Sequence, residues 1–523
     1  MASDDRETSE TSGATTPAGE SAPAVVERRS LVMWLGSFIL VGSFGLGCVL
    51  LVAQLFVDSG NPYVSLATFT IPPAGMTLGG AILLAGAALK WRARRRSIAA
   101  RPLPVLDLNS RRTLIALFTG GIAGVIFLSI SGVATYQAYH FTESTNFCGN
   151  VCHKVMEPEY EAHQNSSHAR VACASCHIGP GADWYVRSKL SGLRQVYAVL
   201  TSDYELPLKT PIHNLRPARD TCEQCHWPAK FSGSTERVLW RYWFDRANTP
   251  SRYHLLMKVG GVNPASGRRE GIHWHIDSNE TVWYWASDER RFDIPWVEVR
   301  RADGTSTVYR RPGTAEPPRD RLRKMDCIDC HNRPAHVMLS PSDLVDMALA
   351  EGTLDRHIPY MKRSAVEILS AVYRSRADAR LAIAEKVRRR FPVGGPGMTA
   401  DKQAGIIATL TGLHDRHDFP DQGASWRTYP SHLGHKSSPG CFRCHDDRHA
   451  AADGKVISKG CDLCHSLIHQ AYGEAAYGPV TFRTREFEHP PGVEIPYDKN
   501  LCSDCHDPKV SWYPANAATA PRR

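Results

Sequence analysis

Seven copies of one short cysteine–histidine pattern are the residues of this chain best suited to chemistry. Each copy has two cysteines followed at once by a histidine, with two residues between the cysteines in six copies and three in the first. The copies are Cys148/Cys152/His153, Cys173/Cys176/His177, Cys222/Cys225/His226, Cys327/Cys330/His331, Cys441/Cys444/His445, Cys461/Cys464/His465 and Cys502/Cys505/His506. C-x-x-C-H is the attachment motif of c-type haem, in which the cysteines hold the porphyrin and the histidine ligates the iron. The motifs use fourteen of the fifteen cysteines and predict seven covalently bound haem c groups.

Structural zinc and disulfide bonds are the other common uses of paired cysteines. A zinc ribbon needs C-x-x-C pairs at matched spacing, and its pairs need no following histidine. A disulfide scaffold is usually a short secreted chain, whereas this chain has 523 residues. A histidine after every pair therefore favours haem over both alternatives.

A haem iron also has a distal axial position, and sixteen histidines outside the motifs could fill it. Two histidine ligands fill both axial positions of the iron, so none is left for a substrate. Such a haem suits electron transfer rather than substrate chemistry. Histidines near the motifs or among apolar residues are the distal candidates: His163, His168, His213, His254, His273, His275, His336, His432, His435, His449, His469 and His489. Met156 is a further candidate for the first haem, or else it only packs there while His153 is the ligand.

Three apolar runs precede the motifs and predict where the haems lie. They cover residues 31–57, roughly 69–89 and 113–136, and each is long enough to cross a bilayer as a helix. The link between the second and third runs is strongly basic, with Lys90, Arg92, Arg94, Arg95, Arg96, Arg101, Arg111 and Arg112. Basic links stay in the cytoplasm, so we predict a three-span inner-membrane protein with a cytoplasmic N-terminus and a periplasmic haem domain.

The expected fold is mainly α-helical with little regular secondary structure, because haems supply much of the core. We expect a disordered cytoplasmic tail at 1–30, three transmembrane helices within 31–136, a three-haem module at 137–230, a small β-rich insertion at 231–326, a fourth haem with a helical segment at 327–427, and a C-terminal three-haem module at 428–523. One long helix is expected over 362–390, and Gly394, Gly395 and Gly397 predict a looser region after it. The net charge of +9 lies partly in the cytoplasmic link and indicates no nucleic-acid partner.

The segment 144–230 resembles the NapC/NirT family of membrane-anchored quinol dehydrogenase cytochromes. The resemblance rests on an apolar span followed directly by NFCGNVCHKVM, then by NSSHARVACASCHIGPG, KLSGLRQVYAV and RPARDTCEQCHWP. With seven motifs, three spans and a long C-terminal extension, the whole chain is similar to the ImcH-type inner-membrane cytochromes. These resemblances imply that menaquinol is oxidised at the periplasmic membrane face. Electrons would then pass to periplasmic c-type cytochromes or a terminal reductase, in anaerobic or extracellular respiration.

The NapC/NirT resemblance also implies a quinol pocket beside the first haem, formed with a lysine and an acidic residue after the second motif. By motif order the lysine corresponds to Lys189, whereas the acidic position falls near Gln195, so the expected carboxylate is missing. Asp183 or Glu157 could replace it. Lys189, Gln195, Asp183 and Met156 are therefore the quinol-site candidates.

Two other functions stay open on the sequence alone. The chain could be an electron-relay subunit without its own quinol site, and the missing carboxylate at Gln195 favours that alternative. It could also be a terminal multihaem reductase. No motif has lysine in place of histidine, as the pentahaem nitrite reductases do, and this disfavours a reductase.

Overall fold

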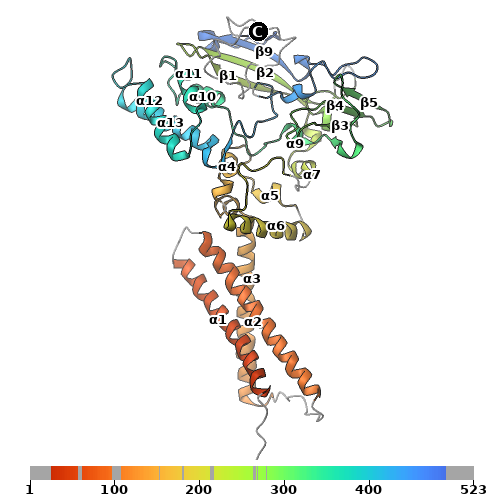
Figure 1. Ribbon diagram of the computed structural model, residues 1–523, viewed down its shortest axis with the longest axis vertical. Coiled ribbons are helices and arrows are strands. Elements are labelled where there is room, and N and C mark those ends of the chain that lie inside the picture. The colour runs from red at the N-terminus through yellow and green to blue at the C-terminus, as the bar shows by residue number, and fades with distance from the viewer. Residues whose placement is uncertain are drawn as a thin grey trace, which may run out of the picture. The chain divides into compact units, whose positions relative to one another are not determined.

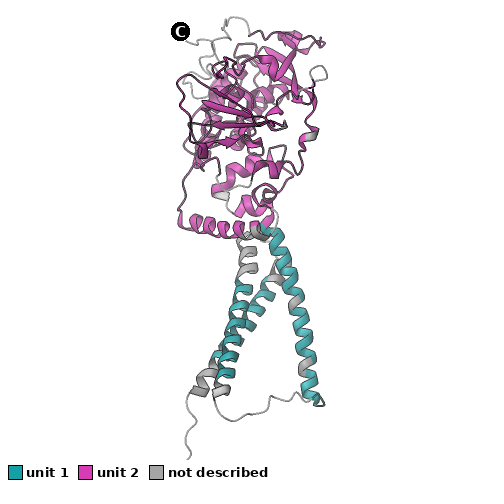
Figure 2. Cartoon of the chain, turned by 90° about the vertical axis from the view of Figure 1, so that its right-hand side faces the viewer, with its two compact units in different colours: residues 1–142 teal, residues 143–523 magenta. Residues whose placement is uncertain are grey.

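The computed structural model describes residues 25–56, 62–96, 108–151, 153–179, 182–212, 217–262, 267, 269–277, 279–436 and 438–489. The chain forms two compact units, residues 1–142 and 143–523 (Figure 2). The first 24 residues of the expected N-terminal tail lie outside the described residues, as does the seventh haem motif.

The first unit consists of long apolar helices, which contain the three runs expected to span the membrane. These are α1 (Val25–Phe56), α2 (Pro62–Arg96) and α3 (Arg111–Glu143), whose last residue belongs to the second unit. Their candidate membrane spans are Val32–Leu50, Ile71–Arg92 and Arg111–Glu143. Helices α1 and α2 approach closely at Gly36 and Gly79, where a Cβ on Gly79 would come 2.7 Å from the backbone nitrogen of Leu40. Small residues at such crossings are typical of helices packed in a membrane.

Short helices carry the haem motifs of the second unit. The described motifs lie on or beside the π-helix η1 (Phe147–Val151), α5 (Cys173–His177), α7 (Ala218–Cys222), α9 (Cys327–Cys330), η5 (Gly440–Arg443) and η6 (Cys461–Leu463). Two longer helices separate the first three motifs, α4 (His153–Gln164) and α6 (Ala182–Thr201) (Figure 1). Longer regular elements directly follow two motifs, since α4 begins at His153 of the first motif and β9 (His465–Tyr472) begins at His465 of the sixth.

Two small antiparallel sheets follow the third motif. The first has the order β1-β2-β9, formed by β1 (Gly233–Tyr242), β2 (Pro250–Gly260) and β9 (His465–Tyr472). The second has the order β5-β4-β3-β6, formed by β3 (Thr281–Trp285), β4 (Trp296–Arg300), β5 (Ser306–Arg310) and β6 (Arg323–Lys324). Six strands thus lie in the segment expected to be β-rich, and a strand from the C-terminal part completes the first sheet. Short elements connect these parts: η2 (Pro228–Lys230), α8 (Trp274–Asp277), η3 (Arg319–Arg321) and η7 (Gly473–Tyr477).

Four helices pack together after the fourth motif and contain the largest apolar core of the described residues. They are α10 (Pro341–Ala350), α11 (Met361–Ser370), α12 (Arg376–Arg390) and α13 (Ala400–His417). The expectation of one helix over 362–390 is wrong, because Ser375 caps a new helix by accepting a hydrogen bond from the backbone N–H of Asp378. The region expected to be loose after Gly397 is also helical, as α13. A hairpin of β7 (Asp418–Phe419) and β8 (Ala424–Ser425), with η4 (Pro420–Gln422) between them, follows α13.

A buried ion pair joins these helices to the first sheet. The ammonium of Lys362 donates to the carboxylate of Asp346 at 2.6 Å, and the same carboxylate accepts from the backbone N–H of Tyr242 at 2.9 Å. Complete burial lowers the pKa of Lys362 to about 8.

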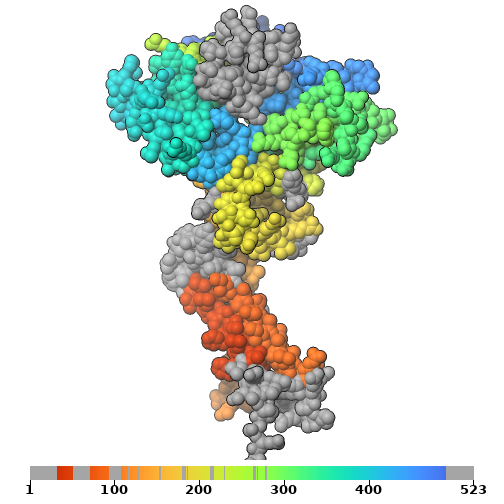
Figure 3. Space-filling model, viewed as in Figure 1, coloured from red at the N-terminus to blue at the C-terminus, as the bar shows by residue number. Residues whose placement is uncertain are grey.

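The helices after the fourth motif and the second sheet lie on two sides of the view in Figure 3. Segments that carry haem motifs lie between them in this view.

Candidate haem-binding and quinol site

The haem motifs share a local geometry that follows from their spacing. The backbone N–H of the motif histidine donates to the carbonyl of the first cysteine at 2.8 Å in His226–Cys222, 2.8 Å in His331–Cys327 and 3.1 Å in His445–Cys441. The second motif forms the one-turn helix α5. Residues four apart lie on one face of a helical turn, so the first cysteine and the histidine can approach the same porphyrin.

The first motif has one more residue, and its backbone accommodates that residue in a π-helix. η1 covers Phe147–Val151, and the motif histidine His153 begins α4 two residues later. A π turn joins residues five apart, one more than an α turn. Cys148 and His153 are five apart in the sequence, which is the separation that a π turn joins, whereas the other motifs have a separation of four. The additional residue is thus compatible with haem attachment.

Five motif histidines each face a second histidine from elsewhere in the chain. The ring centroids are 6.2 Å apart in His177–His336, 6.0 Å in His226–His168, 6.4 Å in His331–His273, 5.9 Å in His445–His275 and 6.2 Å in His465–His435. Two imidazoles on opposite sides of one iron should have centroids about 6.2 Å apart, from metal–nitrogen bonds of about 2 Å and about 1.1 Å from nitrogen to ring centre. The five separations match that value, and all five partners are among the predicted distal candidates.

Hydrogen bonds orient several of these rings through Nδ1. Nδ1 lies 3.0 Å from the carbonyl of Glu159 in His336, 2.9 Å from that of Val259 in His273, 3.0 Å from that of Ile272 in His275 and 2.9 Å from that of Ser458 in His445. Metal-binding histidines usually donate the N–H of their other nitrogen to such a carbonyl. Nδ1 of each ring is thus used by a carbonyl, which leaves Nε2 as the nitrogen that could ligate an iron.

Burial favours the neutral imidazoles that an iron ligand requires. It lowers the pKa of His275 to about 4. Partial burial is also the main cause that lowers the pKa of His177, His331, His336, His435, His445 and His465. A metal ligand must be unprotonated at the binding nitrogen, so these environments fit iron ligation.

Cysteines of consecutive motifs are neighbours in space. A thiol hydrogen bond joins the first motif to the second through Cys148 and Cys173, the third to the fourth through Cys222 and Cys327, and the fifth to the sixth through Cys441 and Cys464. Cys330 of the fourth motif also interacts electrostatically with Cys441 and Cys444 of the fifth. Porphyrins attached at these cysteines would have neighbouring edges.

The two cysteines of the second motif, and those of the third, differ in exposure. Cys176 and Cys225 are exposed, whereas Cys173 and Cys222 are half-buried. Cys176 and Cys225 therefore lie outside the protein core, although both were predicted to bind haem. A thioether forms at the edge of the porphyrin, so an exposed thiol remains within reach of a haem. Haem attachment at Cys176 and Cys225 stays a prediction.

Several predicted haem-binding groups lie outside the description. They are the residues Cys152 of the first motif and Cys502, Cys505 and His506 of the seventh, together with the side chain of His153. Their assignment to haem rests on the sequence pattern alone and stays a prediction. The histidine pairs found in the structure therefore concern the second to sixth motifs.

The remaining distal candidates have other contacts, and one of them, His163, also has its ring centroid 6.2 Å from that of His336. Nε2 of His163 lies 3.0 Å from the carbonyl of Val171, and His432 lies beside Asp329 and Arg443. His449 uses both ring nitrogens, towards Asp446 and the carbonyl of Ile294, which argues against it as a ligand. The other candidates are His254 and His469, which face each other on strands β2 and β9, His489, which packs against Phe487, and His213, which lies outside the described residues.

The proposed quinol-site lysine has a carboxylate partner that the sequence analysis missed. Nζ of Lys189, on α6, lies 2.5 Å from Oε1 of Glu143, the last residue of α3. Both charges act on the thiol of Cys148, so the pair lies beside the first haem motif. In the sequence, only the position of Glu143 could have indicated this contact, because Glu143 ends the third apolar helix just before the first haem motif.

The other quinol-site candidates are less suited to bind a proton. Gln195 is exposed on α6, and its amide donates to Ser191 at 3.4 Å. Glu157 is occupied by an ion pair with Arg376 and by a hydrogen bond of 3.1 Å from Gln422. Met156 is half-buried on α4, and the side chain of Asp183 lies outside the description.

Helix α6 has an exposed apolar face next to Lys189. Leu190, Leu193, Tyr197 and Leu200 are 62 to 79% exposed. Their spacing of three and four residues places them on one side of the helix. An amphipathic helix of this kind is typical of protein that lies on a bilayer surface.

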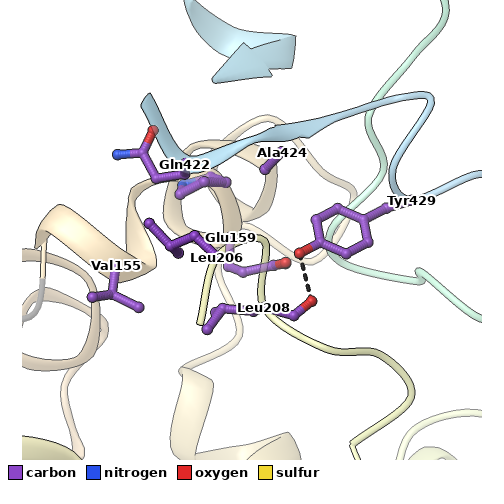
Figure 4. Close-up of a pocket in the computed structure, with 8 residues that line it drawn as sticks. Val155, Glu159, Leu206, Leu208, Gln422, Ala424 and Tyr429 are labelled. Carbon is purple, nitrogen blue, oxygen red and sulfur yellow. Dashed lines mark hydrogen bonds between the residues drawn. The ribbon is translucent and has the colours of Figure 1, made fainter. Parts of the chain in front are cut away.

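A small pocket is lined by residues of α4 and of segments far from α4 in the sequence. Its wall includes Glu159 of α4 together with Leu206, Leu208 and Tyr429 (Figure 4). The hydroxyl of Tyr429 donates to the carbonyl of Leu208 at 2.6 Å. Both carboxylate oxygens of Glu159 accept from Arg333 at 3.1 Å. These contacts fix α4, whose Glu159 carbonyl orients His336, so the pocket is a packing feature of the second haem site.

The chain is similar in sequence to known c-type cytochromes. Residues 108–218 match the N-terminal region of the NapC/NirT cytochrome c family. Over 485 residues the chain is 43% identical to the cytochrome c-type protein ImcH of Geobacter sulfurreducens, covering 90% of this chain and 94% of that protein. The chain belongs to the ImcH-like family of c-type cytochromes. No solved structure matches it.

Membership of the ImcH-like family accounts for the main features of the molecule. The chain is a membrane multihaem cytochrome of electron transfer, and its haem c is bound covalently. The matched NapC/NirT region begins before α3 and includes the first two haem motifs, Lys189 and Glu143. The residues around the first haem motif and the third apolar helix thus belong to one family module.

Proposed function

We propose that this ImcH-like cytochrome oxidises menaquinol at the periplasmic face of the inner membrane and passes electrons along seven haems to periplasmic redox partners. When bound, each haem c supplies one-electron chemistry. The observation that carries the proposal is the position of Lys189, whose charge acts on the thiol of Cys148 in the first motif. A cationic N–H donor beside the first haem suits a quinol hydroxyl.

The apolar face of α6 supports a quinol site at the membrane surface. Lys189 belongs to this helix, and its partner Glu143 ends a candidate membrane span, where the chain leaves the bilayer. We propose that Leu190, Leu193, Tyr197 and Leu200 lie against the lipid. A quinol remains in the lipid, so a site beside this face can receive it directly.

Histidine pairs would hold five of the haem irons. We propose the pairs His177–His336, His226–His168, His331–His273, His445–His275 and His465–His435 for the second to sixth motifs. Two nitrogen ligands leave no open position, which suits electron transfer and disfavours a terminal reductase. The proximity of cysteines from consecutive motifs supports an electron path that follows motif order. The path would run from the first haem to the second and from the third through the sixth.

Reduction by a menaquinol analogue tests the quinol proposal. The oxidised protein in lipid nanodiscs should be reduced by menadiol, as followed by haem absorbance. Lys189→Met should slow this reduction, whereas Lys209→Met, which removes an exposed lysine paired with Glu205, should not. If menadiol leaves the haems oxidised while dithionite reduces them, the relay-subunit alternative is supported instead.

A further inference from the structure

We infer that Glu143 is the carboxylate that accepts the protons of quinol oxidation, in place of the carboxylate missing at Gln195. The inference rests on the proposed quinol function. It assigns a role to a residue that the pattern of family motifs did not indicate.

The ion pair between Glu143 and Lys189 is shielded from solvent more than a surface ion pair. The side chain of Glu143 is 17% exposed and that of Lys189 is 30% exposed, so the pair is partly shielded but remains open to a ligand. The exposed pair of Lys209 and Glu205 differs, since those side chains are 83% and 76% exposed. Partial burial strengthens the attraction between the two charges, so Lys189 holds the Glu143 side chain in place beside the first haem motif.

The backbone places Glu143 close to the first haem motif. The residue after it, Ser144, accepts a hydrogen bond at its carbonyl from the backbone N–H of Cys148 at 3.2 Å. The negative charge of Glu143 also acts on the Cys148 thiol and contributes to raising its pKa, after contact with Cys173 and burial. Glu143 therefore lies five residues before Cys148, at the end of a helix that contains a candidate membrane span.

Other nearby carboxylates are held by strong partners. Glu157 pairs with Arg376, and Glu159 receives two hydrogen bonds from Arg333. The side chain of Arg333 is only 8% exposed, so Glu159 is fixed in a buried bidentate pair. The partner of Glu143 is a lysine, whose ammonium has three donors and can bind a quinol oxygen as well.

The chemistry balances as follows for one menaquinol. Its two O–H bonds break, and it becomes menaquinone by losing two protons and two electrons. Glu143 takes one proton from the nearer hydroxyl, becomes a neutral carboxylic acid, releases that proton to periplasmic water and can then take the second. The first haem c, which the motif Cys148/Cys152 would hold, would accept the electrons one at a time when oxidised. The ammonium of Lys189 stabilises the negative charge that develops on the quinol oxygen.

Glu143→Gln is the direct test, because glutamine keeps the shape and the hydrogen bond to Lys189 but is a far weaker base. In nanodiscs, Glu143→Gln should lower the rate of haem reduction by menadiol at least about tenfold at neutral pH. Glutamine carries no ionisable carboxyl group, so the rate of the variant should depend less on pH than the rate of the unmodified protein. Glu143→Asp should recover part of the rate, and Glu205→Gln should match the unmodified protein.

Two measurements separate a proton-transfer role from a structural one. Binding of an oxidised naphthoquinone, followed by tryptophan fluorescence, should change much less than the rate in Glu143→Gln, and reduction by dithionite should remain complete. A Glu143→Gln variant that keeps the rate and pH profile of the unmodified protein overturns the inference and leaves the quinol function standing. An equal loss of rate and of naphthoquinone binding also overturns it, because Glu143 would then be a binding residue. If menadiol does not reduce the unmodified protein, the quinol function fails, and this inference fails with it.

Discussion

The imidazole planes of His331 and His273 are nearly parallel, at an angle of 6°, and their centroids are 6.4 Å apart. His331 is the motif histidine at the end of α9, and His273 immediately precedes α8. The hydrogen bond from Nδ1 of His273 to Val259 connects this ring to the end of β2. Strand pairing thus positions the proposed haem ligand His273, because β2 is held between β1 and β9.

Removal of His273 should leave the fourth haem attached but leave one axial position of its iron empty. His273→Ala keeps Cys327, Cys330 and His331, so the haem content should not change. The iron should become five-coordinate and high-spin, because it loses one of two nitrogen ligands. Electron paramagnetic resonance of the oxidised protein should show one new high-spin haem, with His357→Ala, an exposed histidine, as the control. An unchanged low-spin spectrum would contradict the proposed His331–His273 pair.

Gly149 should be essential for the first haem site. A Cβ at this position would collide with the ring of Tyr160, which packs against the π-helix η1. Gly149→Ala should therefore displace the turn that bears Cys148 and lower the haem content, measured by the intact mass of the purified protein. Gly405→Ala is the matched control, since it adds a methyl group on α13 where no atom lies within 4 Å. The control should keep all haems and gain up to about 1 kcal/mol from better helix propensity.

Charging the apolar face of α6 should slow the reaction with quinol. Leu193→Glu places a carboxylate where we propose contact with lipid, which costs free energy and moves α6 away from the bilayer. The rate of reduction by menadiol in nanodiscs should fall several-fold, while dithionite still reduces every haem. Leu381→Glu makes the same change at an exposed leucine of α12 and should have no effect. Equal rates in both variants would contradict a membrane contact of α6.

Asp418 should make the protein less stable as the pH rises from about 4 to about 6. Burial raises the pKa of this carboxyl from 3.8 to about 6. The folded protein then binds more protons than the unfolded chain within that window, so the free energy of unfolding falls with rising pH and is constant above it.

Asp418→Asn removes this loss and should stabilise the protein at pH 7 by about 1 to 3 kcal/mol. The increase in Tm over the unmodified protein should be larger at pH 7 than at pH 4. Asp320→Asn, at an exposed aspartate, should show no such difference between the two pH values. A pH-independent increase for Asp418→Asn would assign its effect to packing rather than to ionisation.

Local patterns were sufficient to predict much of the molecule. Apolar length predicts α1, α2 and α3, and alternation of apolar and polar residues predicts β3 and β4. The break between α11 and α12 was missed, since α11 already ends at Ser370 and Ser375 begins α12 through a cap that periodicity does not detect. The partner strand of β2 was missed as well, because β9 lies far along the chain and no local signal indicates long-range pairing.

The sequence by itself determined the covalent chemistry. Haem attachment needs two cysteines and a histidine within one turn, so the spacing of neighbouring residues is enough to identify it. Only the tertiary structure decided which histidines face one another and that Glu143 meets Lys189. These residues are brought together by strand pairing and helix packing, which depend on contacts between distant parts of the chain. The physical reason is that a thioether needs only local geometry, whereas the second face of an iron must be reached from elsewhere in the fold.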